Sequence, residues 1–441
     1  MGLMSVIDRS MYLKQIWKHR WNGRVKIITG IRRCGKSFLL SNLFKARLLE
    51  EGVDSSHIIE VALDRREHDA LRNPNKLFDY VVSRLADPGR YYVFIDEIQL
   101  SYKVLRDGVV LSAIAPEDRE LAYTTFYDVL NDLASRENLD VYVTGSNSRM
   151  LSSDIVTNFR DRGTEIRMAP LTFGEFHRFR NGEKSDDWNE YLVYGGMPAS
   201  TLEPDRKERE AYLFGLFEKV YKADVVERYG IENEYVLDML MNALASSVGS
   251  LTNPTKLSNT LNSEARARTT DATIKKYLNA LEDAFLFSKA QRWDVKGKRY
   301  FNYPMKYYAT DLGLRNARLN FRQIEETHLM ENAIYNELVV RGYSVDVGAV
   351  RFAQTRNGKK KDAMHEIDFV VNRGADKLYI QSALSVEDRD KREQEIAPLL
   401  KSGDFFRKIV VVGGSALPHV DENGITYVGI IPFLLDETII G

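Results

Sequence analysis

The chain has 441 residues but only one cysteine, Cys34, so it contains no internal disulfide bond. The seven histidines are too scattered to join this cysteine in a zinc cluster. No stretch approaches the roughly 18 apolar residues that a membrane helix needs, and the first residues lack an apolar segment behind a basic start. These absences predict a protein of the reducing cytoplasm that has no membrane partner.

The chain also lacks an excess charge of either sign, because 62 lysines and arginines face 63 aspartates and glutamates. Any attraction to nucleic acid must therefore come from a local basic patch. Apolar residues make up 44% and charged residues 28%, as in ordinary globular proteins. This length is too great for one core of usual size and predicts two to four domains.

The first 170 residues alternate short apolar runs with amphipathic helical patterns, such as those at 38–51 and 125–135. This alternation predicts an α/β domain, with a parallel sheet covered by helices. The candidate strands are rich in β-branched and aromatic residues and are short enough to be buried parallel strands. They are residues 24–29, 58–63, 91–95 and 140–144.

Two further regions follow. Helical periodicity dominates residues 171–318, apart from a basic hairpin-like stretch near 293–308. From about residue 319 a long helix is followed by candidate strands at 367–371, 378–381 and 408–412, which predicts a second α/β domain. We therefore expect domains at 1–170, 171–318 and 319–441.

Residues 30–37 (GIRRCGKS) match the phosphate-binding loop pattern GxxxxGK[ST] at every defined position, directly after a strand and before a helix. The glycines let successive backbone N–H groups point at phosphate oxygens. Lys36 is expected to bridge the β- and γ-phosphates of ATP, and Ser37 to ligate Mg²⁺. Cys34 occupies an unconstrained position and is interpreted as structural. The expected nucleotide-binding residues are Gly30, Ile31, Arg32, Arg33, Cys34, Gly35, Lys36, Ser37 and Phe38.

Residues 91–97 (YYVFIDE) form an apolar strand that ends in two carboxylates. Parallel strands deliver such residues to the edge of the sheet where ligands bind. Asp96 is therefore expected to coordinate Mg²⁺, and Glu97 to orient or deprotonate the attacking water. Two adjacent acids favour hydrolysis of ATP to ADP and phosphate over binding alone.

Residues 141–148 (VYVTGSNS) form another strand that ends in small polar residues. Asn147, or its neighbour Ser146, is a candidate sensor of the γ-phosphate, although a turn rich in turn-forming residues explains the pattern equally well. Arg160 and Arg162 follow in a polar segment. Arg160 or Arg162, with Arg162 selected, is the candidate for stabilising transition-state charge, in its own chain or a neighbouring subunit, and solvated surface arginines are the alternative.

The ordered set of motifs ITGIRRCGKSFLL, FIDEIQ, YVTGSNSRML, PLTFGEF, YGGMP, KYYATDLGL and ENAIYNELVVRGY resembles prokaryotic AAA-type ATPases with a C-terminal domain of unknown function. The resemblance covers nearly the whole chain. It implies an AAA+/STAND-like ATPase domain, a winged-helix segment and a C-terminal domain with a restriction-endonuclease-like fold. It supports Lys36, Ser37, Asp96 and Glu97 as nucleotide residues, and the pair Ser146 and Asn147 as the sensor segment.

The middle region favours a winged helix independently of this resemblance. Asp271 is suited to cap a helix whose apolar side includes Ile274 and Leu278, with Lys275 and Lys276 on the other face. Arg266 and Arg268 precede this helix, and Lys296, Lys298 and Arg299 follow it in a candidate wing. The pattern leaves open whether this face binds DNA phosphates, binds a protein or faces solvent.

The last region has the order of a nuclease core, with Glu331 on a helix and Glu366 and Asp368 at the start of a strand. The second strand departs from that pattern, because Gln381 replaces the expected acid and Ala383 the expected lysine. Without the carboxylate and the cation we expect no metal-dependent nuclease activity.

The sequence therefore predicts an Mg²⁺-dependent ATPase whose nucleotide state switches its attached modules. One alternative is a STAND-like signalling or scaffold switch with little basal turnover. The other is a DNA-binding or nuclease-related protein. ATP and ADP are the expected ligands, and a protein partner or a second copy of the chain is compatible with either alternative.

Overall fold

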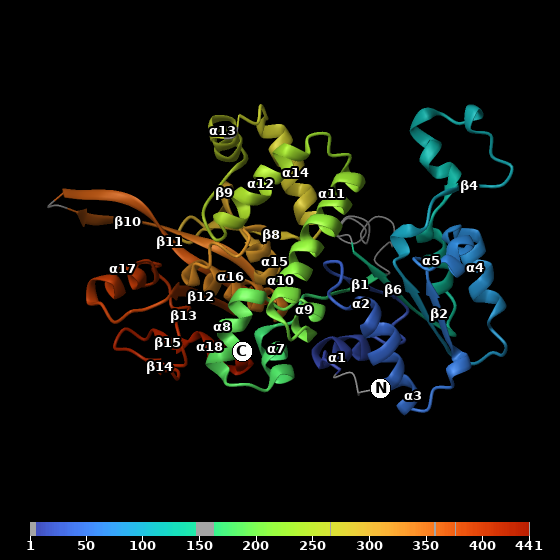
Figure 1. Ribbon diagram of the computed structural model, residues 1–441, viewed down its shortest axis with the longest axis horizontal. Helices are drawn as coiled ribbons and strands as arrows, with labels where there is room; N and C mark the ends of the chain where they lie inside the picture. The colour runs from blue at the N-terminus through green and yellow to red at the C-terminus, as the bar shows by residue number, and fades with distance from the viewer. Residues whose placement is uncertain (1–5, 147–162, 265, 357–358, 375, 441) are drawn as a thin grey trace. The chain divides into compact units, whose positions relative to one another are not determined.

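The computed structural model describes residues 6–146, 163–264, 266–356, 359–374 and 376–440, and describes no side chain of residues 354–361 (Figure 1). The chain divides into two compact units, Met1–Ala169 and Pro170–Gly441. Each unit has its own β-sheet.

The first unit is built on five parallel strands in the order β2-β3-β6-β1-β7. Their bounds are β1 (Val25–Thr29), β2 (Ile58–Ala62), β3 (Tyr91–Asp96), β6 (Leu139–Gly145) and β7 (Gly163–Arg167). The four predicted strands are confirmed to within one residue at every end. The fifth strand, β7, was missed because its sequence GTEIR has one buried residue, Ile166, and no apolar run.

Helices cover both faces of this sheet. They are α1 (Ser10–Lys18), α2 (Lys36–Phe38), a π-helical turn η1 (Leu39–Phe44), α3 (Lys45–Glu50), α4 (Pro74–Ser83) and α5 (Phe126–Ala134). Short 3₁₀ turns lie at Ser55–His57, Arg66–Arg72, Ile98–Leu100, Leu111–Ala113 and Pro116–Ala122, and a small two-stranded ribbon joins β4 (Val104–Leu105) to β5 (Tyr123–Thr124).

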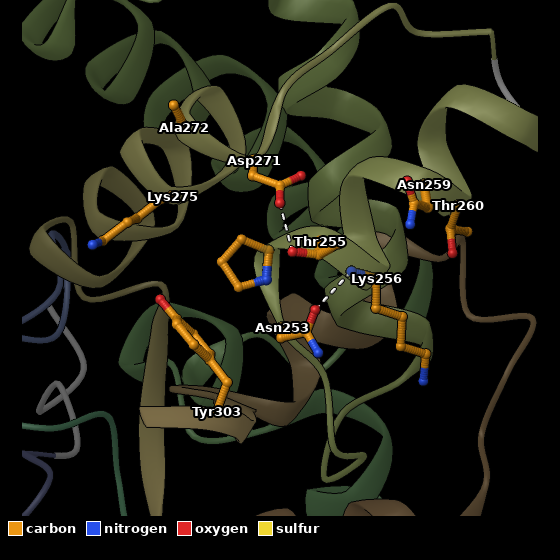
Figure 2. Close-up of a pocket in the computed structure, with 10 residues that line it drawn as sticks. Asn253, Thr255, Lys256, Asn259, Thr260, Asp271, Ala272, Lys275 and Tyr303 are labelled. Atoms are coloured by element: carbon orange, nitrogen blue, oxygen red, sulfur yellow. Dashed lines mark hydrogen bonds between the residues drawn. The ribbon is translucent and has the colours of Figure 1, made fainter. Parts of the chain in front are cut away.

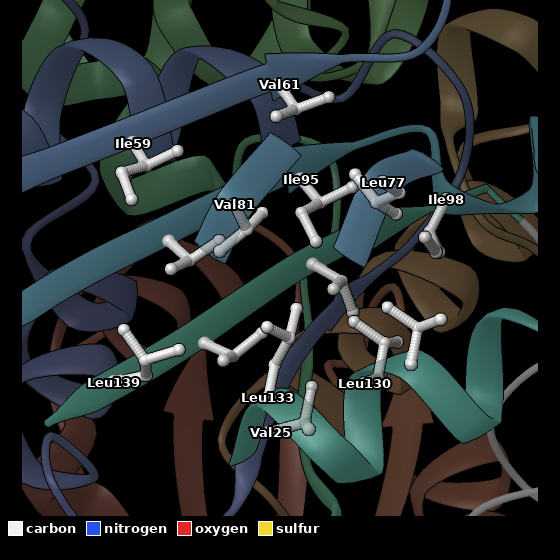
Figure 3. Close-up of a cluster of buried hydrophobic side chains, with 14 of the residues drawn as sticks. Val25, Ile59, Val61, Leu77, Val81, Ile95, Ile98, Leu130, Leu133 and Leu139 are labelled. Carbon is white, nitrogen blue, oxygen red and sulfur yellow. The ribbon is translucent and has the colours of Figure 1, made fainter. Parts of the chain in front are cut away.

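The two faces have different cores. On one face aliphatic side chains of the strands pack against α4 and α5, with Leu77, Val81, Leu130 and Leu133 at the contact (Figure 3). Strand side chains alternate between faces. On the other face aromatic rings from β3 and β6 therefore gather around Phe44 of η1, and these are Tyr92, Phe94 and Tyr142.

The second unit begins with helices α7 (Phe173–Arg180), α8 (Lys184–Tyr194), α9 (Pro198–Leu202), α10 (Arg206–Gly215), η7 (Leu216–Tyr221) and α11 (Lys222–Tyr229). Three more helices follow: α12 (Glu234–Ser246), α13 (Pro254–Glu264) and α14 (Asp271–Asp283). The later helices are α15 (Leu312–Arg318), α16 (Glu326–Val340), α17 (Arg389–Leu400) and α18 (Ile430–Leu435), and a last 3₁₀ turn lies at Glu437–Ile439.

The sheet of the second unit has eight strands in the order β14-β15-β13-β12-β11-β10-β8-β9. They are β8 (Phe287–Asp294), β9 (Arg299–Ala309), β10 (Ser344–Arg356), β11 (Lys359–Arg373), β12 (Asp376–Ala383), β13 (Arg407–Val412), β14 (His419–Val420) and β15 (Thr426–Gly429). Helix α17 packs against β11 and β12, while α16 packs against β9, β10 and β12.

The hairpin of β8 and β9 belongs to this sheet, because β8 pairs in parallel with β10 through Arg292, Trp293 and Asp294. The strands predicted near 293–308 therefore exist, but they extend the sheet that also contains the C-terminal strands. A domain boundary between residues 318 and 319 stays a prediction, since strands from both sides of it share one sheet.

The buried carboxylate of Asp311 connects two sequence motifs to which the sequence analysis assigned no role. In YGGMP and TDLGL, Gly196 N donates to Asp311 Oδ2 at 2.7 Å, and Leu314 N donates to Asp311 Oδ1 at 2.9 Å. A Cβ on Gly195, which has φ +65°, would lie 2.4 Å from Asp311 Oδ1. Only glycine fits this position, because the backbone conformation and the space both exclude a side chain.

Candidate nucleotide site

The phosphate-binding loop joins β1 to α2 and has a backbone that only glycine adopts readily. Gly30 has φ +140° and Gly35 has φ +101°. A Cβ on Gly30 would lie 2.0 Å from the carbonyl oxygen of Met168, next to β7. The glycines of the motif are therefore required by conformation and by close backbone approach.

Lys36 begins the helix after the loop and is buried. Its Nζ donates to the carbonyl oxygens of Gly30 and Ile31, at 3.0 Å each. The loop's own backbone thus holds the ammonium group against the turn, where the sequence predicts the β- and γ-phosphates. A cation fixed in this way needs little reorganisation to stabilise phosphate charge.

The next residue, Ser37, meets the carboxylate at the end of β3. Ser37 Oγ donates to Asp96 Oδ1 at 2.9 Å, and Thr144 Oγ1 of β6 donates to the same oxygen. The sheet order explains the meeting, since β6 lies between β1 and β3 and all three strands end at one edge. A hydroxyl and a carboxylate side by side are oxygen donors of the kind that Mg²⁺ prefers.

Glu97 follows Asp96 in a left-handed conformation with φ +53°, which turns its backbone N–H towards Thr144 Oγ1 at 3.0 Å. Burial raises the pKa of Glu97, and this effect outweighs the opposing charge of Lys36. The nearby Asp96 raises the pKa further. A carboxylate with a raised pKa beside a phosphate-binding lysine is suited to accept a proton.

Gln99 is a site residue that the sequence analysis did not single out. Its Nε2 donates to Glu97 Oε2 and lies 3.3 Å from Ser146 Oγ at the end of β6. Gln99 thereby connects the carboxylate to the candidate sensor segment. The only signal in the sequence was its place two residues after the acidic pair.

The remaining predicted nucleotide residues divide by exposure. Ile31 and Cys34 point into the core, and Cys34 Sγ lies 3.6 Å from the carbonyl oxygen of Met168. Arg32, Arg33 and Phe38 are exposed. Loop residues of this kind contact phosphate through their backbone N–H groups. The buried and the exposed side chains are therefore equally compatible with the prediction. Asn147, Arg160 and Arg162 lie outside the described residues.

A second polar cluster lies in the second unit, where the nuclease-like pattern was expected. Lys306 of β9 is buried and its Nζ contacts three carboxylates, at 2.8 Å from Glu331, 2.6 Å from Glu366 and 3.2 Å from Asp368. The expectation that no cation accompanies these acids is therefore wrong. The lysine comes from another strand, so the pattern around Ala383 could not reveal it.

Two further features shape this cluster. Opposite Val347 the register of β10 and β11 shifts, so that Asp368 and Phe369 together face one residue of β10, the pattern of a β-bulge. Gln381 Nε2 donates to Glu395 Oε2 at 2.9 Å, and Gln381 Oε1 accepts from Asp368 N at 3.3 Å. Among the described residues, no three side chains of metal-binding type converge to hold a metal ion.

No helix within the described ranges is long and apolar enough to cross a membrane. Residues 22–177 match the AAA domain family, and residues 185–325 match a domain of unknown function. An uncharacterized protein of Haemophilus influenzae is 31% identical over 437 residues, which are 98% of this chain and 99% of that protein. The uncharacterized protein MJ1544 of Methanocaldococcus jannaschii is 26% identical over 407 residues, which are 89% of this chain and 80% of that protein.

Two solved structures show a weak likeness. The ORC1 protein of Aeropyrum pernix in complex with DNA has 12% identity and a TM-score of 0.27, covering 72% of this chain and 94% of that chain. Cdc6p of Pyrobaculum aerophilum has 14% identity and a TM-score of 0.26, covering 72% and 95%. TM-scores this low support no conclusion about the fold or function of this chain. The AAA match and the P-loop geometry agree, so the first unit is an AAA-type P-loop domain and the chain belongs to the same family as the Haemophilus influenzae protein.

Proposed function

We propose that the AAA domain hydrolyses ATP to ADP and phosphate with Mg²⁺, and that the nucleotide state switches the modules attached to it. One observation carries the hydrolysis. The partly buried carboxylate of Glu97 has a raised pKa and directly follows Asp96, which is hydrogen-bonded to Ser37 of the phosphate-binding loop. A protein that only bound ATP would not need a proton acceptor at this position.

The chain's residues have distinct roles in the proposed reaction. Lys36 and the loop N–H groups hold the phosphates, so that the γ-phosphorus faces the edge of the sheet. Glu97 orients a water molecule and accepts its proton as the water oxygen bonds to the γ-phosphorus. The bond from that phosphorus to the β,γ-bridging oxygen breaks, and ADP leaves with the bond's electron pair.

Ser37 Oγ and the Asp96 carboxylate fit a Mg²⁺ ion, because both are oxygen donors and lie 2.9 Å apart. When bound, Mg²⁺ neutralises charge on the β- and γ-phosphate oxygens. Thr144 holds Asp96 Oδ1 through its hydroxyl group. It thereby fixes the direction of the carboxylate towards the loop.

Two variants test the assignment. Lys36→Ala should abolish hydrolysis, because it deletes the cation held against the loop. Glu97→Gln should keep nucleotide affinity and lose turnover, since an amide occupies the same space without accepting a proton. ATP affinity and phosphate release are measured for both. Undiminished turnover in Lys36→Ala would overturn the proposal, and loss of both binding and turnover in Glu97→Gln would show that Glu97 is structural.

The hydrogen bond from Gln99 to Glu97 favours a second candidate, a STAND-like switch with little basal turnover. In that case the carboxylate stays engaged by Gln99 until a partner releases it. Gln99→Leu should then raise the basal rate at pH 8. A basal rate equal to or below that of the wild type would favour the constitutive ATPase over the switch.

The proposed partners besides ATP and ADP are DNA at the basic face of α14, and a protein or a second copy of this chain. Asn147 as sensor and Arg162 as an arginine acting in its own chain or in a neighbour remain proposals. Mixing Lys36→Ala subunits with Arg162→Ala subunits tests the trans arrangement. Restored hydrolysis supports it, and no restoration with a monomeric wild type excludes it.

We also propose that the sheet of the second unit has the restriction-endonuclease-like fold and has lost its chemistry. Glu331, Glu366 and Asp368 are all engaged by the buried ammonium of Lys306, so a metal ion would have to compete with it. Incubation with plasmid and single-stranded DNA in Mg²⁺ or Mn²⁺ should give no cleavage. Cleavage that disappears in Asp368→Ala would refute this.

A further inference from the structure

Positive charge is concentrated in one segment of the second unit. Residues 253–303 contain ten lysines and arginines against five aspartates and glutamates, a local charge of +5 in a chain whose net charge is −1. The remainder of the chain is therefore acidic, and it cannot attract a polyanion by its overall charge.

The segment presents this charge on a pair of helices. Helices α13 and α14 pack together, and α14 buries an apolar side formed by Ile274, Tyr277, Leu278 and Leu281. Its other side exposes Lys275, Lys276 and Asn279, and the exposed Arg266 and Arg268 precede it. Two packed helices that follow one another closely in the chain, the second with a polar outer side, suit a helix-turn-helix.

The cations of this segment differ in whether an acidic side chain pairs with them. Lys289 pairs with Glu282, and Arg299 lies near Asp294. No such ion pair forms at Lys256, Arg266, Arg268, Lys275 or Lys276 within the ranges that the structure describes. Unpaired cations gathered on one surface need an external anion to offset their mutual repulsion.

Asp271 shows how Lys275 is kept available. The two residues are four apart on α14, the spacing at which a helix normally forms an ion pair. Asp271 instead accepts hydrogen bonds from Thr255 at 2.5 Å and from Ser258, both on α13. These bonds lower the pKa of Asp271 and keep its carboxylate directed at α13. Lys275 is therefore left without its natural partner.

A pocket of about 740 Å³ lies between the first turns of the two helices and Tyr303 of β9 (Figure 2). Lys256 and Lys275 line it from the two helices, and Asn253 and Asn259 add amide groups. Tyr303 is 40% exposed and presents its ring and hydroxyl group at the edge. Cations, amides and an aromatic ring around a hollow suit a sugar-phosphate backbone.

We propose that this surface binds double-stranded DNA, with α14 in the major groove and Lys256 and Lys275 on backbone phosphates. The proposal specifies the DNA partner suggested above and does not require that the protein hydrolyse ATP. A helix-turn-helix places the first residues of its second helix against base edges while the other helix faces the backbone. Besides Asp271 and Ala272, α14 exposes three residues. Lys275 lines the pocket and takes a phosphate, and Lys276 and Asn279 are left to face base edges.

The full-length protein is titrated into a fluorescent 20-base-pair duplex at several salt concentrations, and anisotropy is recorded. Lys256→Ala/Lys275→Ala should weaken binding at least about tenfold at low salt, and the slope of log K against log salt should fall by about 2, since each phosphate contact contributes roughly 0.9. Lys256→Arg/Lys275→Arg should retain both. Arg206→Ala/Lys207→Ala, two exposed cations on α10, is the matched control and should bind like the wild type.

Three results would overturn the proposal: no duplex binding by the wild type at low salt, equal loss in the α10 control, or tighter binding of a single strand of equal length. Melting temperature and ATPase rate are recorded for each variant, to show that the proteins are folded. Lys36→Ala is titrated alongside. DNA binding that persists in Lys36→Ala while hydrolysis is absent separates failure of this proposal from failure of the ATPase assignment.

Discussion

Replacing Lys306 by methionine should destabilise the second unit strongly. The side chain is buried, and its ammonium group is the nearest cation to Glu331, Glu366 and Asp368. Methionine fills a similar volume but leaves the three carboxylates without that charge. Breaking a buried ion pair from one side costs about 3–5 kcal/mol. We therefore expect the melting temperature of this unit to fall by about 10 °C, at roughly 2–4 °C per kcal/mol.

The loss should depend on pH in a defined direction. Burial already raises the pKa of Glu331 to about 7 and also raises that of Glu366, although Lys306 opposes both shifts. The folded state therefore binds protons that the unfolded state releases above about pH 4.5, and the cluster stabilises the fold less as pH rises towards 7. Without Lys306 the pKa values rise further, so the deficit of the variant should be larger at pH 8 than at pH 5.5.

The assay is thermal unfolding of the wild type and Lys306→Met at pH 5.5 and pH 8. Lys391→Met, an exposed lysine of α17 in the same unit, is the matched control and should melt like the wild type. Adding Glu331→Gln to Lys306→Met should recover part of the loss, because it removes one unpaired carboxylate. A variant that melts with the wild type at pH 8, or whose deficit grows at pH 5.5, would refute the reasoning.

Three other perturbations follow from the geometry. Turnover needs ionised Glu97, so kcat should fall as the pH drops below the raised pKa of Glu97. The hydrogen bond from Gln99 lowers that pKa, so Gln99→Leu should shift this fall in kcat to higher pH in a pH–rate profile. Thr144→Val removes the hydroxyl partner of Glu97 N and one of the two hydroxyl partners of Asp96, since Ser37 stays bonded to Asp96. It should cost about 2–4 kcal/mol in urea unfolding, because each lost hydrogen bond costs about 1–3. Gly195→Ala should cost about 1–3 kcal/mol for a backbone conformation that is essentially restricted to glycine (φ 65°, ψ −158°), and more for a Cβ placed 2.4 Å from a carboxylate oxygen. Soluble yield and melting temperature check the last change.

The nucleotide site could be predicted from the sequence because its parts are local. The loop 30–37 is one continuous motif, and Asp96 and Glu97 end an apolar strand that periodicity alone identifies. Parallel pairing then brings the strand ends to one edge. The sequence did not reveal that Thr144 hydrogen-bonds Asp96 and Glu97, because a threonine inside a buried strand is also an ordinary strand-forming residue.

The second unit was predicted less well, because its contacts join residues far apart in the chain. Lys306 stands in an apolar run, and no local pattern shows that it meets Glu331 and Asp368 from other elements. Strand β10 was not predicted, and β11 was predicted only at 367–371. Their outer halves carry many charges, as in KKKDAMHE, where alternation is weak and a long hairpin resembles a loop.

The hairpin of β8 and β9 has a consequence for how this chain can be divided. A cut between residues 318 and 319 would remove both strands from the sheet and turn β10, thirteen residues long, into an open edge. An unprotected edge of this length invites pairing with other copies. The same cut would separate Lys306 from its carboxylates. The strands after residue 318 therefore need the hairpin of β8 and β9 to complete their sheet, and a truncated protein has to keep that hairpin.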